Sequence, residues 1–207
     1  PICRTAQDCA LVLAAIHGAD PRDNASVDRP FKFRPDVDVK KIKIGYLSDD
    51  KGLDKDDTGN GPDDALKLLR ELGANPMPIK FTQPADGIDN VLSVEAAAAF
   101  EDITRDKRVD TVSSSAWPAI FKNHQFCTGV GYLQAMRART LLMQKFEEEL
   151  GDFDLIVAAD RGSYLLFITN LTGHPQLYVP FGVDKTKAPR GVSLIGRLYD
   201  EGTILAV

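Results

Sequence analysis

The sequence has few cysteines and no long apolar segment, and both shortages exclude classes of protein. Three cysteines, Cys3, Cys9 and Cys127, occur without a CxxC or histidine-spaced pattern. This odd number predicts neither a disulfide framework nor a metal site, and it fits a reducing compartment, so we expect a cytoplasmic protein. No uninterrupted apolar run reaches the roughly 18 to 20 residues that cross a bilayer, so no membrane-spanning segment is predicted.

A surplus of basic residues is also absent. Lysine and arginine together number 25, against 30 aspartates and glutamates, which gives a net charge of -5. Surfaces that bind nucleic acid concentrate Lys and Arg to neutralise phosphates, so a direct nucleic-acid partner is not expected. The hydrophobic content of 43% and charged content of 27% are typical of a globular protein with a substantial core.

Both ends of the sequence predict that the chain is part of a longer one. Residue 1 is a proline followed at once by a helix signal. Asp200 to Val207 have the pattern of the first turns of a helix and lack a C-cap. We therefore expect truncation at both ends, which leaves the true N-terminus and any signal peptide unseen.

Segments of helical and strand periodicity alternate along the chain. Apolar residues at three- and four-residue steps predict helices from Thr5 to Gly18, from Pro62 to Gly73, from about 94 to 105 and near 130–150. Short apolar runs bounded by Gly, Pro and Asp predict strands at 42–47, 77–81, 154–159, 176–181 and 192–195, the last three of them buried. Residues 19–39 are rich in proline and predict a surface connection. The alternation predicts an α/β fold.

Local patterns do not identify a catalytic set. Ser113, Ser114 and Ser115 form the only serine cluster, and turn formation and helix capping before Trp117 explain them without chemistry. The three histidines are far apart in sequence, and His17 is expected to cap or pack at a helix end. A triad of Ser115, His174 and Asp160 can be drawn, but the spacing does not support it.

Several segments resemble one known family in the order in which that family has them. The run TNLTGHPQLYVPFGV at 169–183, followed by GVSLIGRLYDEGTIL at 191–205, closely resembles the C-terminal hallmark of the amidase signature family. The N-terminal PICRTAQDCALVLAAIHGAD is similar to the segment just after that family's signature region. The runs YLQAMRARTLLMQKFEEEL and FDLIV are similar to its late helix and strand. The resemblance extends to bacterial amidases and to the A subunit of glutamine-dependent tRNA amidotransferases.

The resemblance implies an amide hydrolase whose catalytic groups lie outside this chain. The family uses a serine nucleophile, a second serine in a cis peptide and a lysine, all upstream of the segment that matches Pro1. No catalytic residue is therefore assigned here, and no metal or organic cofactor is expected. Residues 1–207 are expected to be the C-terminal part of a single amidase domain. They would form a portion of its mixed β-sheet with flanking helices.

The predicted substrate-binding residues follow the strand at 154–159. Ligand sites in α/β proteins gather beyond strand ends, which favours Asp160, Arg161, Ser163 and Asn170. A simple loop ion pair between Asp160 and Arg161 is an open alternative. The resemblance implies that the amidotransferase A subunits carry an acidic residue near the position of Ser163. Because this chain has a serine there, a different amide substrate is favoured.

The sequence thus predicts an enzyme fragment that cleaves carbon–nitrogen bonds only as part of the intact protein. Its expected partners are a small-molecule amide substrate and the missing upstream segment of the same protein, and homo-oligomerisation is open. Two alternatives remain. One is the A subunit of a glutamyl-tRNA(Gln) amidotransferase, which would add glutamine hydrolysis and partner subunits. The other is a noncatalytic binding module on the amidase scaffold.

Overall fold

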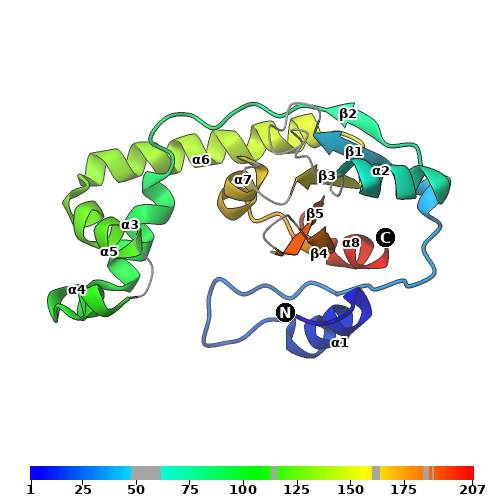
Figure 1. Ribbon diagram of the computed structural model, residues 1–207. Helices are drawn as coiled ribbons and strands as arrows, with labels where there is room; N and C mark the ends of the chain where they lie inside the picture. Colours follow the sequence, from blue (N-terminus) through cyan, green and yellow to red (C-terminus); the bar gives the residue numbers. More distant parts are fainter. Residues whose placement is uncertain (48–61, 113–115, 160–163, 184–186, 188) are drawn as a thin grey trace. The chain divides into compact units, whose positions relative to one another are not determined.

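The chain forms two compact units (Figure 1). A computed structural model describes residues 1–47, 62–112, 116–159, 164–183, 187 and 189–207. The first unit comprises Pro1–Phe81 and Leu150–Val207, and the second comprises Thr82–Glu149. The first unit contains the described strands, and the second unit is helical. The two units are described separately.

A five-stranded mixed sheet organises the first unit. Its strands are β1 (Ile44–Leu47), β2 (Met77–Ile79), β3 (Leu155–Ala159), β4 (Gln176–Val183) and β5 (Pro189–Gly196). The spatial order is β2-β1-β3-β5-β4. β1 is parallel to β2 and β3, whereas β5 is antiparallel to β3 and β4. This arrangement confirms the predicted α/β class and mixed sheet.

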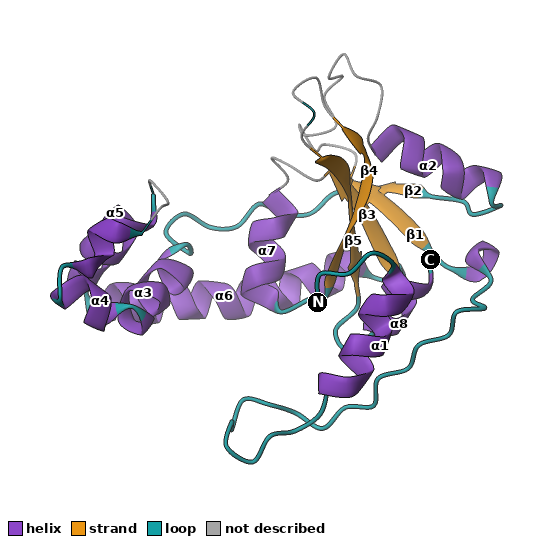
Figure 2. Ribbon diagram, turned by 60° about the horizontal axis from the view of Figure 1, so that its bottom comes forward, coloured by secondary structure: helices purple, strands orange, loops and turns teal. Residues whose placement is uncertain are grey.

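Helices cover both faces of this sheet (Figure 2). On one face, α2 (Pro62–Glu71) and α8 (Glu201–Ala206) contribute to a core with strand residues that include Ile44, Val157 and Leu194. Side chains alternate along a strand, so Ser193 points to the opposite face. There the Gln176 amide links it to Thr169 of α7 (Tyr164–Thr172), which therefore covers that face.

The N-terminal helix begins as predicted, but its buried side differs. In α1 (Ala6–Ile16), the Thr5 hydroxyl accepts a hydrogen bond of 3.0 Å from the Asp8 backbone N–H. Cys9 and Ala10 are buried against Leu205 of α8, whereas Ile16, which was expected on the apolar face, is 68% exposed. The contact with α8 covers only the first turns of α1.

The apolar face of α2 is rotated relative to the prediction. Ala65 and Leu69 are buried as expected, together with Leu66. Leu68 and Leu72 are 44% and 50% exposed. Leu66 packs in the core between α2 and the sheet. Leu68 and Leu72 therefore lie at the margin of the contact between α2 and the sheet.

Residues 17–38 contain no helix or strand, as predicted, and lead to the short 3-10 helix η1 (Val39–Lys41). Part of this segment lies directly against α8. A Cβ atom built on Gly202 would overlap the backbone carbonyl of Lys32. Glycine at this position therefore permits the close approach of the two backbones.

The second unit is built from helices. They are α3 (Asn90–Ala99), α4 (Glu101–Arg105), η3 (Arg108–Thr111), α5 (Trp117–Asn123), η4 (His124–Phe126) and α6 (Gly129–Leu150), whose last residue belongs to the first unit. The long helix near 130–150 is confirmed. The single helix expected at 94–105 is wrong, because Phe100 leaves helical geometry and stacks on Phe121 at a centroid distance of 4.9 Å.

The two outer strands of the described sheet differ in kind. β2 has three residues, includes Pro78 and precedes Lys80, features that protect an edge against further pairing. β4 has eight residues and none is charged. Its side chains alternate between half-buried and exposed, so the prediction of a buried strand is wrong for this chain. Pro180 and the register shift between Pro180 and Val183 interrupt β4, but its edge carries no charge, so we expect it to recruit another strand.

We predict that the isolated chain binds hydrophobic dye and associates with increasing concentration. Placing a charge on the β4 edge with Val183→Lys should reduce association, because charged edge residues oppose strand pairing. Val130→Lys on α6 is the matched control, since Val130 is also exposed but lies outside the sheet. Dye fluorescence and sedimentation measure both effects. A monomer that unfolds cooperatively and binds little dye would contradict this prediction.

Candidate functional site

The carboxyl ends of β1, β2, β3 and β4 lie at one edge of the sheet, and that of β5 lies at the other. Leu47 pairs with Ile79 and Tyr46 with Val157, so β1, β2 and β3 have their carboxyl ends on the same side. β4 is also parallel to β3, because both are antiparallel to β5. The carboxyl edge of an α/β sheet is where ligands commonly bind, so this edge is the first candidate site.

Three of the four predicted substrate-binding residues follow β3 in the sequence. Asp160, Arg161 and Ser163 lie outside the described residues, as do Ser113 to Ser115, so their assignment remains a prediction. Asn170 is exposed in the last turns of α7, six residues beyond Tyr164. At 1.5 Å per residue, this is about 9 Å along the helix from its start. The structure thus places Asn170 toward the end of α7 that leads into β4, away from the end that follows β3.

A tyrosine that the sequence did not single out fixes the start of α7. The Tyr164 hydroxyl donates a hydrogen bond of 3.2 Å to the Phe81 carbonyl, just beyond the end of β2. The bond joins two segments that leave the same edge of the sheet. Its only sequence signal is a tyrosine at the beginning of an apolar helix, which predicts no partner.

A buried polar network holds the middle of α7. Thr169 Oγ1 lies 2.9 Å from Gln176 Oε1, and Gln176 Nε2 donates to Ser193 Oγ at 2.8 Å. Thr169 and Ser193 are both buried. Thr169 Oγ1 also lies 3.0 Å from the Leu166 carbonyl. Because buried polar groups need partners, the Gln176 amide holds α7 against β4 and β5.

The histidines are engaged with local groups. His17 Nδ1 lies 3.0 Å from the Ala14 carbonyl, as expected for a helix-end residue, and His124 Nδ1 lies 3.0 Å from the Ile120 carbonyl. His174 is buried with Nδ1 2.8 Å from the Thr172 hydroxyl. The arrangement gives no support to the Ser115, His174 and Asp160 triad, because His174 precedes β4 at the edge opposite to the end of β3.

Cys3 lacks the lowered pKa of an activated thiol. Desolvation and a hydrogen bond with Cys9 raise the pKa of the Cys3 thiol. A thiol with a raised pKa is protonated at neutral pH and reacts slowly. The described part of the chain also contains no group of three His, Cys, Asp or Glu side chains that could hold a metal ion. None of the helices in that part is long and apolar enough to cross a membrane.

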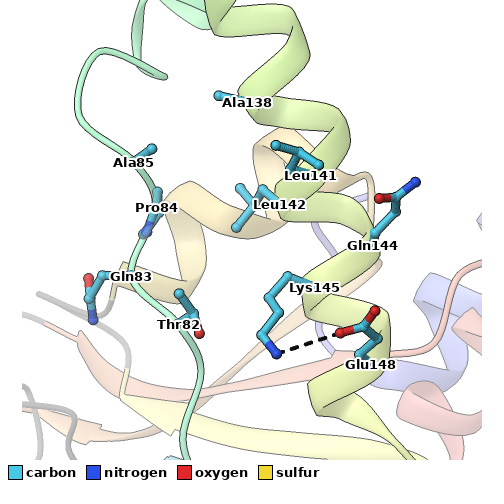
Figure 3. Close-up of a pocket in the computed structure, with 10 residues that line it drawn as sticks. All are labelled: Thr82, Gln83, Pro84, Ala85, Ala138, Leu141, Leu142, Gln144, Lys145 and Glu148. Carbon is cyan, nitrogen blue, oxygen red and sulfur yellow. Dashed lines mark ion pairs between the residues drawn. The ribbon is translucent and has the colours of Figure 1, made fainter.

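A cleft in the second unit is a separate candidate (Figure 3). It has a volume of about 410 Å³ and lies between residues 82–85 and α6. Leu142 and the stem of Lys145 project from the helix toward Pro84. Lys145 Nζ forms ion pairs of 3.5 Å with Glu148 and 3.6 Å with Glu149. The cleft thus combines apolar walls with a charged end.

Comparison with known families identifies the class of protein. The model of the Amidase family matches residues 1–205, and the chain therefore belongs to that family. The match confirms the resemblance on which the predicted fold and function depend.

Among curated proteins, the chain is similar to the A subunits of glutamyl-tRNA(Gln) amidotransferases. It is 28% identical to the one from Carboxydothermus hydrogenoformans, over 100% of this chain and 52% of that protein. It is 25% identical to the one from Novosphingobium aromaticivorans, over 99% of this chain and 51% of that protein. The chain thus spans about half the length of the relatives it matches.

Solved structures show the same fold. A bacterial aryl acylamidase of the amidase signature family matches with a TM-score of 0.75 at 19% identity, over 99% of this chain and 50% of that chain. The A subunit of the glutamyl-tRNA(Gln) amidotransferase from Thermotoga maritima matches with a TM-score of 0.65 at 21% identity, over the same shares. The sheet described above is thus shared with larger proteins of this family.

We predict that Gln176→Leu lowers the free energy of unfolding by about 1–3 kcal/mol, because it leaves the buried Thr169 and Ser193 hydroxyls without the amide. Gln134→Leu on an exposed position of α6 is the control and should change stability little. Urea unfolding of the polypeptide that carries this chain measures both. Equal effects of the two substitutions would show that the network does not hold α7.

Proposed function

We propose that this chain is the C-terminal part of an amidase that hydrolyses the carbon–nitrogen bond of a small-molecule amide. The observation that carries the proposal is the family match over residues 1–205. The names of the similar proteins support it, since an aryl acylamidase and the amidotransferases both act at carbon–nitrogen bonds. The reducing compartment favoured by the cysteines makes the cytoplasm the proposed location.

The proposal places the catalytic groups in the part of the relatives that this chain does not span. Amide hydrolysis needs an activated nucleophile, a proton carrier and oxyanion donors held together. The histidines of the described residues are engaged with backbone or threonine oxygens, and Cys3 lacks the lowered pKa of an activated thiol. The role proposed for this chain is to complete the sheet and part of the substrate cleft.

Two surfaces favour attachment to the rest of an amidase domain. The first is the uncharged edge of β4. The second is an apolar groove of about 240 Å³ in the first unit, whose lining includes the exposed Leu68 and Leu72 and the β4 residues Leu177 and Phe181. Burying such surfaces is favourable by roughly 25 cal/mol per Å² of apolar area, so covering them would stabilise the assembled domain.

The proposed substrate contacts are the residues that follow β3. Asp160, Arg161 and Ser163 come directly after a strand that ends at the carboxyl edge. The proposed set also includes Asn170, whose side chain is exposed on α7. A carboxylate and a hydroxyl can accept from the N–H of an amide and a guanidinium can donate to its carbonyl, whereas Asn170, about 9 Å along α7, would contact a more distant part of the substrate.

A second candidate is the A subunit of an aminoacyl-tRNA amidotransferase. The names of the curated relatives favour it, at 24–28% identity. This function would require partner subunits and glutamine hydrolysis. Glutamine-dependent amidation of a mischarged tRNA, restored by adding candidate partner proteins, would distinguish it from hydrolysis of a free amide. A noncatalytic module would do neither.

We predict that Asp160→Asn in the full-length polypeptide changes kcat/KM between amide substrates and leaves stability nearly unchanged. The substitution removes a charge while keeping the size of the side chain, so it alters substrate preference if the carboxylate faces the cleft. Asp152→Asn is the control, because Asp152 is highly exposed and pairs only with Lys43 at 3.2 Å in the described residues. Unchanged kinetics on several amides would remove Asp160 from the proposed site.

We also predict that the isolated chain does not hydrolyse amides, and that co-expression with the rest of an amidase domain restores turnover. Loss of a whole catalytic triad costs on the order of a million-fold in kcat in a serine hydrolase, which residual cleft contacts cannot offset. The assay is run on the purified chain with Ser113 to Ser115 intact and then replaced by Ala. Turnover that depends on those serines would instead indicate a self-sufficient hydrolase.

A further inference from the structure

The cleft between residues 82–85 and α6 has apolar residues on both of its walls (Figure 3). Its apolar lining residues are Pro84, Ala85, Ala138, Leu141 and Leu142. Leu142 is buried, whereas Leu141 is 66% exposed. An exposed leucine alone carries no information, but a leucine on a concave wall can bury its side chain against a ligand.

The wall opposite α6 is anchored to this helix at Thr82. The Thr82 backbone N–H and hydroxyl both donate to the Glu149 carboxylate, at 2.8 Å and 2.6 Å. The Glu149 side chain is only 19% exposed, so these charge-assisted bonds are partly shielded from solvent. Two residues later, Pro84 restricts the backbone further. A preformed wall lowers the entropic cost of binding.

The charged end of the cleft offers both a donor and an acceptor. The Lys145 ion pairs of 3.5 Å and 3.6 Å are longer than the roughly 2.7–3.2 Å of a direct N–H···O hydrogen bond. The ammonium can therefore donate to a ligand oxygen. The Glu148 side chain is 70% exposed and can accept from a ligand N–H.

The balance of charge at this end disfavours charged ligands. A carboxylate would be repelled by Glu148 and Glu149, and an ammonium placed at the Lys145 donor would be repelled by that ammonium. A neutral carboxamide satisfies both groups, because its carbonyl accepts from Lys145 and its N–H donates to Glu148. The volume of about 410 Å³ lies in the range of small-molecule sites, roughly 300–1,000 Å³.

We infer that this cleft binds a neutral carboxamide through its amide group at Lys145 and Glu148 and through an aliphatic or aromatic group at Leu141 and Leu142. The inference rests on the proposed function in one respect, namely that the bound carboxamide is also a substrate that the full-length protein hydrolyses. Binding itself is measurable without hydrolysis.

The test compares four probes on the full-length polypeptide that carries this chain. Hexanamide, hexanoate and hexylammonium share one apolar chain and differ in charge, and acetamide lacks the chain. Ligand-observed NMR titration is expected to show saturable binding of hexanamide, weaker binding of both charged analogues and none of acetamide. Equal or tighter binding of hexanoate or of hexylammonium would overturn the assignment of a neutral ligand.

Matched variants locate the binding. Leu141→Asp should weaken hexanamide binding about tenfold, because it removes apolar contact and adds a third carboxylate. Leu133→Asp on the same helix should leave binding unchanged, since Leu133 is also exposed but does not line the cleft. Leu141→Ala is a second, milder variant. Thermal unfolding compares its stability with that of the unsubstituted protein.

Two outcomes separate this inference from the proposed function. Absent hexanamide binding, or equal weakening by Leu141→Asp and Leu133→Asp, would overturn the site. Binding that depends on Leu141 in a protein that hydrolyses no amide would uphold the site and remove the proposed function instead.

Discussion

The pairing of β3 on both sides is the interaction on which the rest of the first unit depends. β3 joins the parallel strands β1 and β2 to the antiparallel pair β5 and β4. Leu155 and Ile156, whose side chains point to opposite faces, are both completely buried. A strand buried on both faces fixes the register of its neighbours, because a slip of one residue would exchange the two faces. It also fixes the edge at which the chain continues into the proposed substrate site.

Patterns in the sequence predicted the elements that local chemistry determines. The Thr5 cap, the Pro62 start and the Gly73 end of the second helix were all recognisable, because capping and turn formation use neighbouring residues. Features that depend on residues distant in the sequence could not be predicted. The break at Phe100 depends on a stack with Phe121, and the rotated face of α2 depends on how the helix meets the sheet.

The same distinction between local and distant determinants applies to the two candidate sites. The residues after β3 could be predicted, because a strand followed by polar residues marks a common ligand position. The cleft in the second unit could not be predicted, since residues 82–85 have no recognisable pattern and the periodicity of α6 does not show which segment lies beside Lys145. The β4 edge was predicted as buried because its composition suits an interior strand, and such a composition favours a further strand beside it.

The central claim is that this chain completes an amidase whose nucleophile lies elsewhere. Labelling the full-length polypeptide with a serine-directed fluorophosphonate, followed by mass-spectrometric mapping of the modified peptide, tests it most directly. We expect one modified serine outside residues 1–207 and loss of amide hydrolysis in proportion to labelling. A stoichiometrically modified serine within residues 1–207, such as one of Ser113 to Ser115, would contradict this claim.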